Sequence, residues 1–172
     1  MNTKKMVYAA VILALSIAIP AIFHFTGLPG NIFLPMHLPV LIGGLLLGPL
    51  YGLIVGVLAP ILNFFLTNMP PVPILYIMIF ELGAYGLFTG LLYKKSNRLF
   101  ISLLASLVIG RFVAAVVVFV LVQTMTGFDA NPIVWFTGSF VKSFPGIAIQ
   151  LILIPLLVSR IELSTKSNLK IE

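Results

Sequence analysis

The sequence predicts an all-α integral membrane protein with six transmembrane helices and both termini in the cytoplasm. Three observations support this fold class. The 172-residue chain is 60% hydrophobic and 8% charged, whereas a soluble domain carries about 25% charged residues. Its mean hydropathy is +1.20, and apolar runs long enough to cross a bilayer recur along its length. Its basic side chains gather on one side of those runs. The chain therefore lacks the polar residues that would cover a surface in water.

The first predicted span covers residues 6–23. It follows "MNTKK" and so resembles a signal peptide, but its apolar run is longer than the roughly 7–15 residues of a secretory signal. No small-residue cleavage site follows, so we expect a retained first helix. Ala10, Ala14 and Ala18 recur four residues apart on one face of it, where small side chains let another helix approach closely. This stripe is interpreted either as packing inside the bundle or as a docking face for another membrane protein.

The second and third predicted spans, residues 35–50 and 51–66, are short for the ~30 Å hydrocarbon core. We expect them to be tilted, broken or packed inside the bundle. Pro35 and Pro39 flank His37, which excludes a regular helix through this histidine and places it at a helix entrance on the outer side. Glycines at small intervals predict that the two helices pack back to back across the turn "GPLYG". These glycines are Gly43, Gly44, Gly48, Gly52 and Gly56.

The last three predicted spans cover residues 74–93, 99–124 and 133–159. The fifth and sixth exceed the about 20 residues that a crossing needs, so we expect them to tilt or to project beyond the lipid. A single six-helix domain over residues 1–172, with a cytoplasmic tail from about residue 160, accounts for the chain.

The distribution of positive charge gives the orientation. Eight of the ten Lys and Arg residues precede the first span, separate the fourth from the fifth, or follow the sixth: Lys4, Lys5, Lys94, Lys95, Arg98, Arg160, Lys166 and Lys170. The segments on the opposite side, residues 23–34, 67–73 and 125–132, contain none. By the positive-inside rule, both termini are cytoplasmic. The protein is therefore expected to be a multi-pass membrane protein in contact with lipid.

Three ionisable residues fall inside predicted spans. Such residues are energetically expensive in a membrane and usually face the bundle interior, where they pair with one another. Arg111 lies 13 residues beyond Arg98, which places it near mid-membrane at 1.5 Å per residue, and Glu81 has a similar depth. One interpretation is a structural ion pair between Glu81 and Arg111. The other is that Glu81, Lys142 or both reach a substrate cavity. Lys142 can alternatively extend toward a membrane interface.

Polar and aromatic residues gather in the outer loops and the outer helix ends. A few polar groups in an apolar cavity are typical of a small-molecule site. His24, which stands alone, is interpreted as a cap or an interface anchor, and Asp129 belongs to the same outer group. The candidate substrate-binding residues are His37, Asn63, Asn68, Tyr76, Glu81, Tyr85, Asn131, Trp135 and Lys142.

The sequence has no pattern typical of an enzyme. It contains two histidines and no cysteine, no metal-ligand spacing and no GxxxxGK[ST] phosphate-binding loop. We therefore expect a binding module that needs no metal and no cofactor, and any ATP hydrolysis would be supplied by other subunits. The distribution of positive charge along the membrane spans accounts for the net positive charge of the chain. Nucleic acid is therefore not an expected partner.

Two stretches carry a resemblance to a known family. "PMHLPVLIGGLLLGPLYGLIVGVLAPIL" and "FELGAYGLFTGLLY", within residues 33–93, resemble the substrate-binding S component of energy-coupling factor vitamin importers. "GRFVAAVV" and "FPGIAIQLILIPLLV" resemble it more loosely, and the size, the six spans and the alanine stripe also match. The resemblance implies an S-component-like bundle that binds a water-soluble vitamin with high affinity. It also implies docking through Ala10, Ala14 and Ala18 onto a transmembrane coupling protein (the T component), which two cytoplasmic ATPases drive, and a toppling movement that delivers substrate inward.

The sequence leaves the substrate and two other functional classes open. If Glu81, Arg111 and Lys142 all face the interior, one cation is uncompensated, which suits a carboxylate such as pantothenate. If Lys142 reaches an interface, a nearly neutral cavity suits hydroxymethylpyrimidine or pyridoxine. The alternatives in other classes are an autonomous secondary carrier, in which Glu81 takes up and releases a proton, and a structural membrane subunit without a ligand. The absence of an evident inverted repeat disfavours the carrier.

Overall fold

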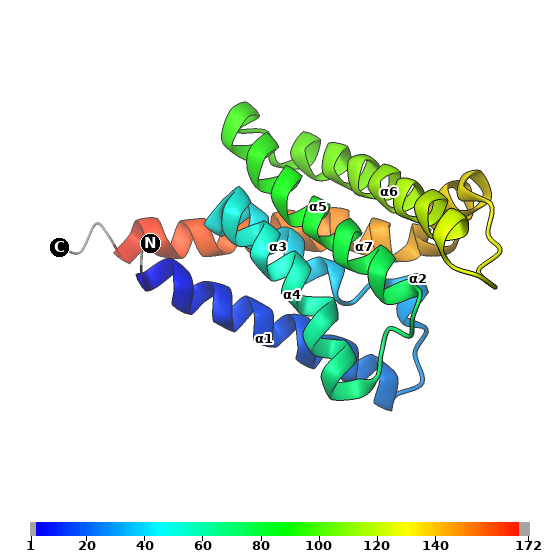
Figure 1. Cartoon of the computed structure of the whole chain (residues 1–172). Helices are drawn as coiled ribbons and strands as arrows, with labels where there is room; N and C mark the ends of the chain where they lie inside the picture. The colour runs from blue at the N-terminus through cyan, green and yellow to red at the C-terminus, as the bar shows by residue number, and fades with distance from the viewer. Residues whose placement is uncertain (1–2, 169–172) are drawn as a thin grey trace.

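The fold is a helical bundle in which six segments are long and apolar enough to cross a membrane, which confirms the predicted fold class (Figure 1). The computed structural model describes the backbone of residues 3–168 and the side chains of residues 3–160. Those residues form only helices and connections. The helices are α1 (Thr3–Phe25), α2 (Gly30–Phe33), α3 (His37–Leu47), α4 (Pro49–Thr67), α5 (Ile74–Ser96), α6 (Leu99–Thr124) and α7 (Pro132–Asn168). The short α2 and α3 together make the second span.

The boundary between the second and third spans differs from the predicted one. The sequence predicts it after residue 50, but α3 ends at Leu47 and α4 begins at Pro49. Gly48 joins them with a φ of 94°, a left-handed conformation that glycine adopts without a steric cost. Pro49 then occupies the first turn of α4, where its missing N–H removes no helical hydrogen bond. The turn therefore lies at Gly48, and α4 gains the length of a full span.

Residues that favour helix ends define where several of the other helices begin or end. Asn68 and Asn97 follow α4 and α5 in the left-handed conformation that commonly ends a helix. At the start of α7, the side-chain oxygen of Asn131 accepts hydrogen bonds from the backbone N–H groups of Ile133 (2.9 Å) and Val134 (3.3 Å). His37 begins α3, at the helix entrance that its flanking prolines predict. The ends of α4 and α5 and the starts of α3 and α7 are therefore defined by local chemistry.

The last helix extends beyond its predicted span. α7 has 37 residues, or about 55 Å at 1.5 Å per residue, which exceeds the ~30 Å hydrocarbon core. The helix continues through residues 160–168, which the sequence assigns to a cytoplasmic tail. The side chains of Lys166 and Lys170, which contributed to the predicted orientation, lie outside the described residues.

The glycines of α3 and α4 pack against a different helix from the one that the sequence predicts. The sequence predicts that they join α3 to α4, but they mainly face α5. A Cβ atom added at Gly44 or Gly52 would collide with the backbone carbonyl of Gly86, and one at Gly56 would lie 2.6 Å from the carbonyl carbon of Leu82. Gly52 would also meet α3, at 2.7 Å from the Cα atom of Gly44. Since α5 has its own glycine at this junction, the three helices meet backbone to backbone.

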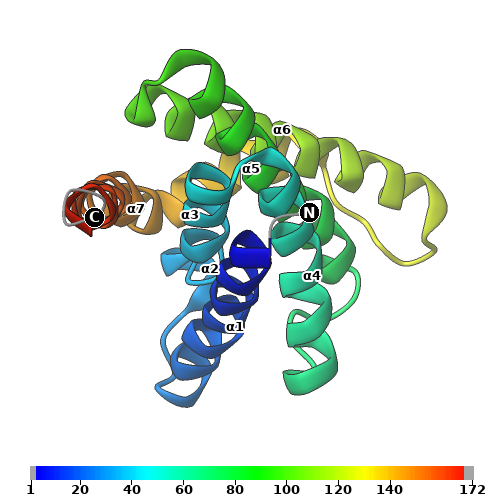
Figure 2. The same ribbon diagram turned by 90° about the vertical axis from the view of Figure 1, so that its left-hand side faces the viewer.

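The centre of the bundle is α3, and α1 is peripheral. α3 packs against α1, α4, α5 and α7, as the view along the bundle shows (Figure 2). Only one face of α1 is buried, at Ile12, Ser16 and Pro20. The amide nitrogen of Asn63 on α4 donates to the backbone oxygen of Ser16 (3.0 Å). One side of α1 is therefore fixed to the bundle and the opposite side is free.

Candidate functional site

A cavity of about 790 Å³ opens near the end of the bundle that holds the α1–α2, α4–α5 and α6–α7 connections (Figure 1). The positive-inside rule predicts that this end lies outside the cell. All six spans contribute to the wall, which is mostly apolar with a few polar groups. Size and polarity of this kind are typical of a small-molecule site. The cavity thus lies where the sequence analysis expects the binding site.

A buried ion pair forms one wall of the cavity. Nη1 of Arg111 on α6 lies 2.7 Å from Oε1 of Glu81 on α5, which is the contact given by one of the two interpretations of the sequence. The hydroxyl group of Tyr85, one turn beyond Glu81, donates to the same oxygen (2.9 Å). Nη2 of Arg111 donates to the hydroxyl oxygen of Ser143 on α7 (2.9 Å). Since both charged residues are buried and carry further hydrogen bonds, the pair joins α5, α6 and α7 at a fixed geometry.

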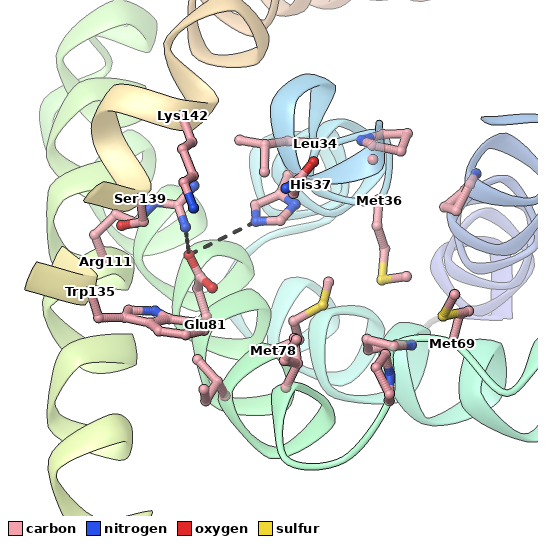
Figure 3. A pocket seen from close by; sticks show the side chains of 18 of the residues that line it. Leu34, Met36, His37, Met69, Met78, Glu81, Arg111, Trp135, Ser139 and Lys142 are labelled. Carbon is pink, nitrogen blue, oxygen red and sulfur yellow. Dashed lines mark ion pairs between the residues drawn. The ribbon is translucent and has the colours of Figure 1, made fainter. Parts of the chain in front are cut away.

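His37 lies beside this pair at the start of α3 (Figure 3). Its side chain is 4% exposed, and its Nε2 atom is 3.9 Å from Oε1 of Glu81, which is too far for a hydrogen bond. The ring packs against the ring of Tyr85 at a centroid distance of 5.2 Å. Among the described residues, neither ring nitrogen of His37 has a hydrogen-bond partner, and Nε of Arg111 also lacks one. Buried polar groups without partners are costly, and both residues that carry these atoms line the cavity.

Lys142 approaches the same region from α7. Its side chain lines the cavity, and its amine points toward the ion pair (Figure 3). It is exposed because it faces the open volume, and no carboxylate lies within 4 Å of its amine among residues 3–160. Ser139 and Trp135 line the cavity on the same face of α7, one and two turns earlier respectively. All three intramembrane ionisable residues therefore reach the cavity.

Three methionines form a second, apolar part of the wall. Met36, Met69 and Met78 lie across the cavity from Arg111 and Lys142 (Figure 3). Sequence reasoning missed them because it searched for polar groups only. Met36 and Met69 each lie next to a proline in a predicted outer connection. This position beside the expected binding site is the sequence feature that could have identified them. Methionine is flexible and polarisable, so it fits an irregular ligand surface.

Two further predicted residues line the cavity while holding the bundle together. The amide nitrogen of Asn63 donates to the backbone oxygens of Ser16 and Ala59, so Asn63 also links α4 to α1. Asn131 caps α7. Tyr85 is fully buried and lies outside the lining. It contributes by holding Glu81 and His37.

Other predicted residues lie away from the cavity, and one unexpected residue reaches it. Asn68 ends α4 and is exposed, and Asp129 is also outside the lining. Tyr76 is 43% exposed on α5, because the face of α5 that lines the cavity is formed by residues 74, 77, 78 and 81. His24, interpreted as a cap or an anchor, lines the cavity from the end of α1. Within the described residues, no group of three or more His, Cys, Asp or Glu side chains could hold a metal ion.

The alanine stripe faces away from the bundle. Ala10, Ala14 and Ala18 are all exposed, and the buried face of α1 is a different one. The structure therefore differs from the interpretation in which the stripe packs inside the bundle. A free helix face with small side chains in the membrane region can accept a closely packed partner helix.

Comparison with known proteins gives the family. The model of the family described as "ECF transporter, substrate-specific component" matches residues 4–158, from the first turn of α1 far into α7. Searches of curated proteins and of solved structures give no significant match. The matched region includes every residue assigned here to the cavity. The chain therefore belongs to the family of ECF transporter substrate-specific components, and it is a multi-pass membrane protein.

Proposed function

We propose that this protein captures a water-soluble vitamin or vitamin precursor outside a prokaryotic cell and delivers it inward through the plasma membrane. The observation that carries the proposal is the outer cavity with its unpartnered buried polar atoms on His37 and Arg111. A site whose polar atoms lack protein partners is prepared for a ligand that supplies them. Membership of the family supports a binding subunit rather than an enzyme.

Delivery requires partners in this proposal. A transmembrane coupling protein docks on the free face of α1, and two cytoplasmic ATPases drive it. The exposed Ala10, Ala14 and Ala18 support this assignment, because small side chains permit the backbone approach on which helix association in lipid depends. The larger side chains of Val11 and Leu15 flank the stripe and are 53% and 46% exposed.

The substrate candidates are a carboxylate of the pantothenate type and a ring compound such as hydroxymethylpyrimidine or pyridoxine. The autonomous proton-coupled carrier is less well supported. In that mechanism Glu81 would have to take up and release a proton, yet its carboxylate is held by Arg111 and by the hydroxyl group of Tyr85. A proton on Glu81 would remove the countercharge of a buried guanidinium, which is strongly unfavourable.

One substitution separates these functions. Ala14→Trp places bulk at the middle of the exposed stripe, far from the cavity lining. We expect purified Ala14→Trp protein to bind the ligand with the affinity of the wild type, while uptake is lost in cells that supply the coupling protein and ATPases. The ligand is first identified by native mass spectrometry of wild-type protein purified from rich medium.

The matched control is Val108→Trp. Val108 lies on α6 and is 52% exposed, and α6 packs mainly against α5 and α7. This variant should keep both binding and uptake, because a lipid-facing tryptophan on α6 blocks no partner. Uptake by Ala14→Trp at the wild-type rate would refute docking through this face, and loss of binding would show that the stripe supports the bundle itself.

A further inference from the structure

We infer that the ligand is a monoanion with one carboxylate, which Lys142 binds, and with an otherwise neutral body that lies against the methionine wall. This inference rests on the proposed function and narrows its substrate class. It follows from four features of the cavity: a compensated ion pair, one uncompensated cation, unpartnered hydrogen-bonding atoms and a distinct apolar wall.

The first feature is that the ion pair of Glu81 and Arg111 has no net charge, so it does not attract an anionic ligand. Its guanidinium is 2.7 Å from the carboxylate of Glu81, and both side chains are buried. Hydrogen bonds from Tyr85 to Glu81 and from Arg111 to Ser143 complete the arrangement. Because both partners of a buried ion pair are needed to keep either charge stable, the pair remains formed and contributes a net charge of zero.

The second feature is that Lys142 is a cation without a countercharge. It lies on the cavity wall, points inward, and has no carboxylate partner among residues 3–160 (Figure 3). Its side chain is exposed, so water can reach the amine. A neutral ligand that covered it would remove this water and leave a charge without a partner, which is costly. A carboxylate would instead replace the water with a charge-assisted hydrogen bond.

The same charge balance disfavours a ligand with two negative charges. A phosphate ester or a dicarboxylate would satisfy Lys142 and leave one anionic group close to the carboxylate of Glu81. His37 is not a second cation to receive it, because its ring is buried and neither ring nitrogen has a hydrogen-bond partner among the described residues, and a buried charge without hydrogen bonds is costly. The third feature is the set of unpartnered hydrogen-bonding atoms, which are the ring nitrogens of His37 and Nε of Arg111. They suit neutral groups of the ligand, such as hydroxyl or amide groups.

The fourth feature sets the orientation of the ligand. Met36, Met69 and Met78 lie across the cavity from Lys142 (Figure 3) and offer no countercharge. An apolar chain or ring fits there and removes apolar surface from water. The carboxylate end therefore points toward α7, and the neutral end points toward the α4–α5 connection.

The test compares compounds that differ in the carboxylate alone. Purified full-length protein is incubated with an equimolar mixture of pantothenate, nicotinate and biotin and their neutral counterparts pantothenol, nicotinamide and biotinamide, together with pyridoxine and hydroxymethylpyrimidine. Native mass spectrometry then identifies the bound mass, and titration with that compound gives its affinity. We expect a carboxylate to be retained and its neutral counterpart to bind about 10- to 100-fold more weakly, the range for loss of a hydrogen bond to a charged group.

Variants of Lys142 supply the second readout. Lys142→Met keeps the length and removes the charge, and it should weaken binding of the carboxylate about 10- to 100-fold with little effect on its neutral counterpart. Lys142→Arg keeps the charge and should retain more of the affinity. The matched control Lys95→Met removes one exposed positive charge from the last turn of α5, away from the cavity, and should bind as the wild type does.

The possible outcomes distinguish the monoanion inference from the proposed binding function. Retention of a neutral compound, or equal affinity of wild type and Lys142→Met for a carboxylate, would overturn the monoanion inference and leave the proposed binding function standing. Retention of none of the compounds would contradict both. Selective loss of carboxylate binding in Lys142→Met, with normal binding in Lys95→Met, would support the inference.

Discussion

Two adjacent glycines in α3 give a sharp test of how the bundle is packed. Gly43 and Gly44 differ only in the face of the helix on which they lie. A Cβ atom at Gly44 would collide with the carbonyl oxygen of Gly86 and would lie 3.2 Å from its carbonyl carbon and 3.3 Å from the backbone nitrogen of Gly90. A Cβ atom at Gly43 would lie 3.4 Å and 3.8 Å from side-chain carbons of Ile12, which is ordinary contact. Gly44→Ala therefore meets backbone, and Gly43→Ala meets a side chain that can adjust.

The expected magnitudes follow from this difference. An alanine in a helix is more stable than a glycine by about 0.5–1 kcal/mol, and both variants gain this term. Only Gly44→Ala also incurs the overpacking cost, about 1–3 kcal/mol, because α5 must move away as a rigid backbone. The difference between the two variants is therefore about 1–3 kcal/mol. For chains of this size a difference of about 2 kcal/mol corresponds to roughly 4–8 °C in Tm.

The assay is thermal unfolding of the purified variants in the same detergent, followed by ligand titration. Gly44→Ala should unfold several degrees below Gly43→Ala and should bind more weakly, because α3 and α5 position His37 and Glu81. Gly43→Ala should match the wild type or exceed it in both measurements. Equal Tm values for the two variants would refute the backbone contact between α3 and α5.

Two further predictions concern the buried polar groups. Glu81→Gln should destabilise the protein by about 3–5 kcal/mol in thermal unfolding, because it leaves the buried charge of Arg111 without a partner; the double variant Glu81→Gln/Arg111→Met should recover much of the loss, and equal stability of single and double variants would contradict the reasoning. Gln150→Leu should speed ligand dissociation about 2- to 10-fold in a chase experiment, since it removes the hydrogen bond (3.3 Å) from Gln150 on α7 to the backbone oxygen of Leu34 in the cavity wall. An unchanged dissociation rate would show that this bond does not hold the α2–α3 connection over the ligand.

The sequence alone determined the class and the spans of this protein. A chain with so few charged residues has lipid as its solvent over most of its length, and each apolar run must then form a helix, since backbone polar groups in lipid need internal partners. The fifth span illustrates this constraint, because residues 99–124 were predicted to form it and α6 covers Leu99–Thr124. The same reasoning gave an ion pair between Glu81 and Arg111 as one of two interpretations, because isolated charges at that depth are too costly.

The sequence determined less of the site. A prediction based on polarity and depth found His37, Glu81, Trp135 and Lys142, which do line the cavity. It could not establish which way each helix is rotated about its axis. Tyr76 is polar and lies at a suitable depth, but it is exposed on the side of α5 away from the cavity.

Only the tertiary structure decided the faces, the partners and the charge balance. Near-uniform hydrophobicity around a membrane helix leaves little periodic signal, so its inward face is decided by close packing with other helices. That packing turns Met78 toward the cavity, Gly44 toward Gly86, and the alanines of α1 away from the bundle. It also brings Lys142 to the cavity without a countercharge, because charge balance depends on the distance between side chains on different helices, and no pattern within one helix encodes that distance.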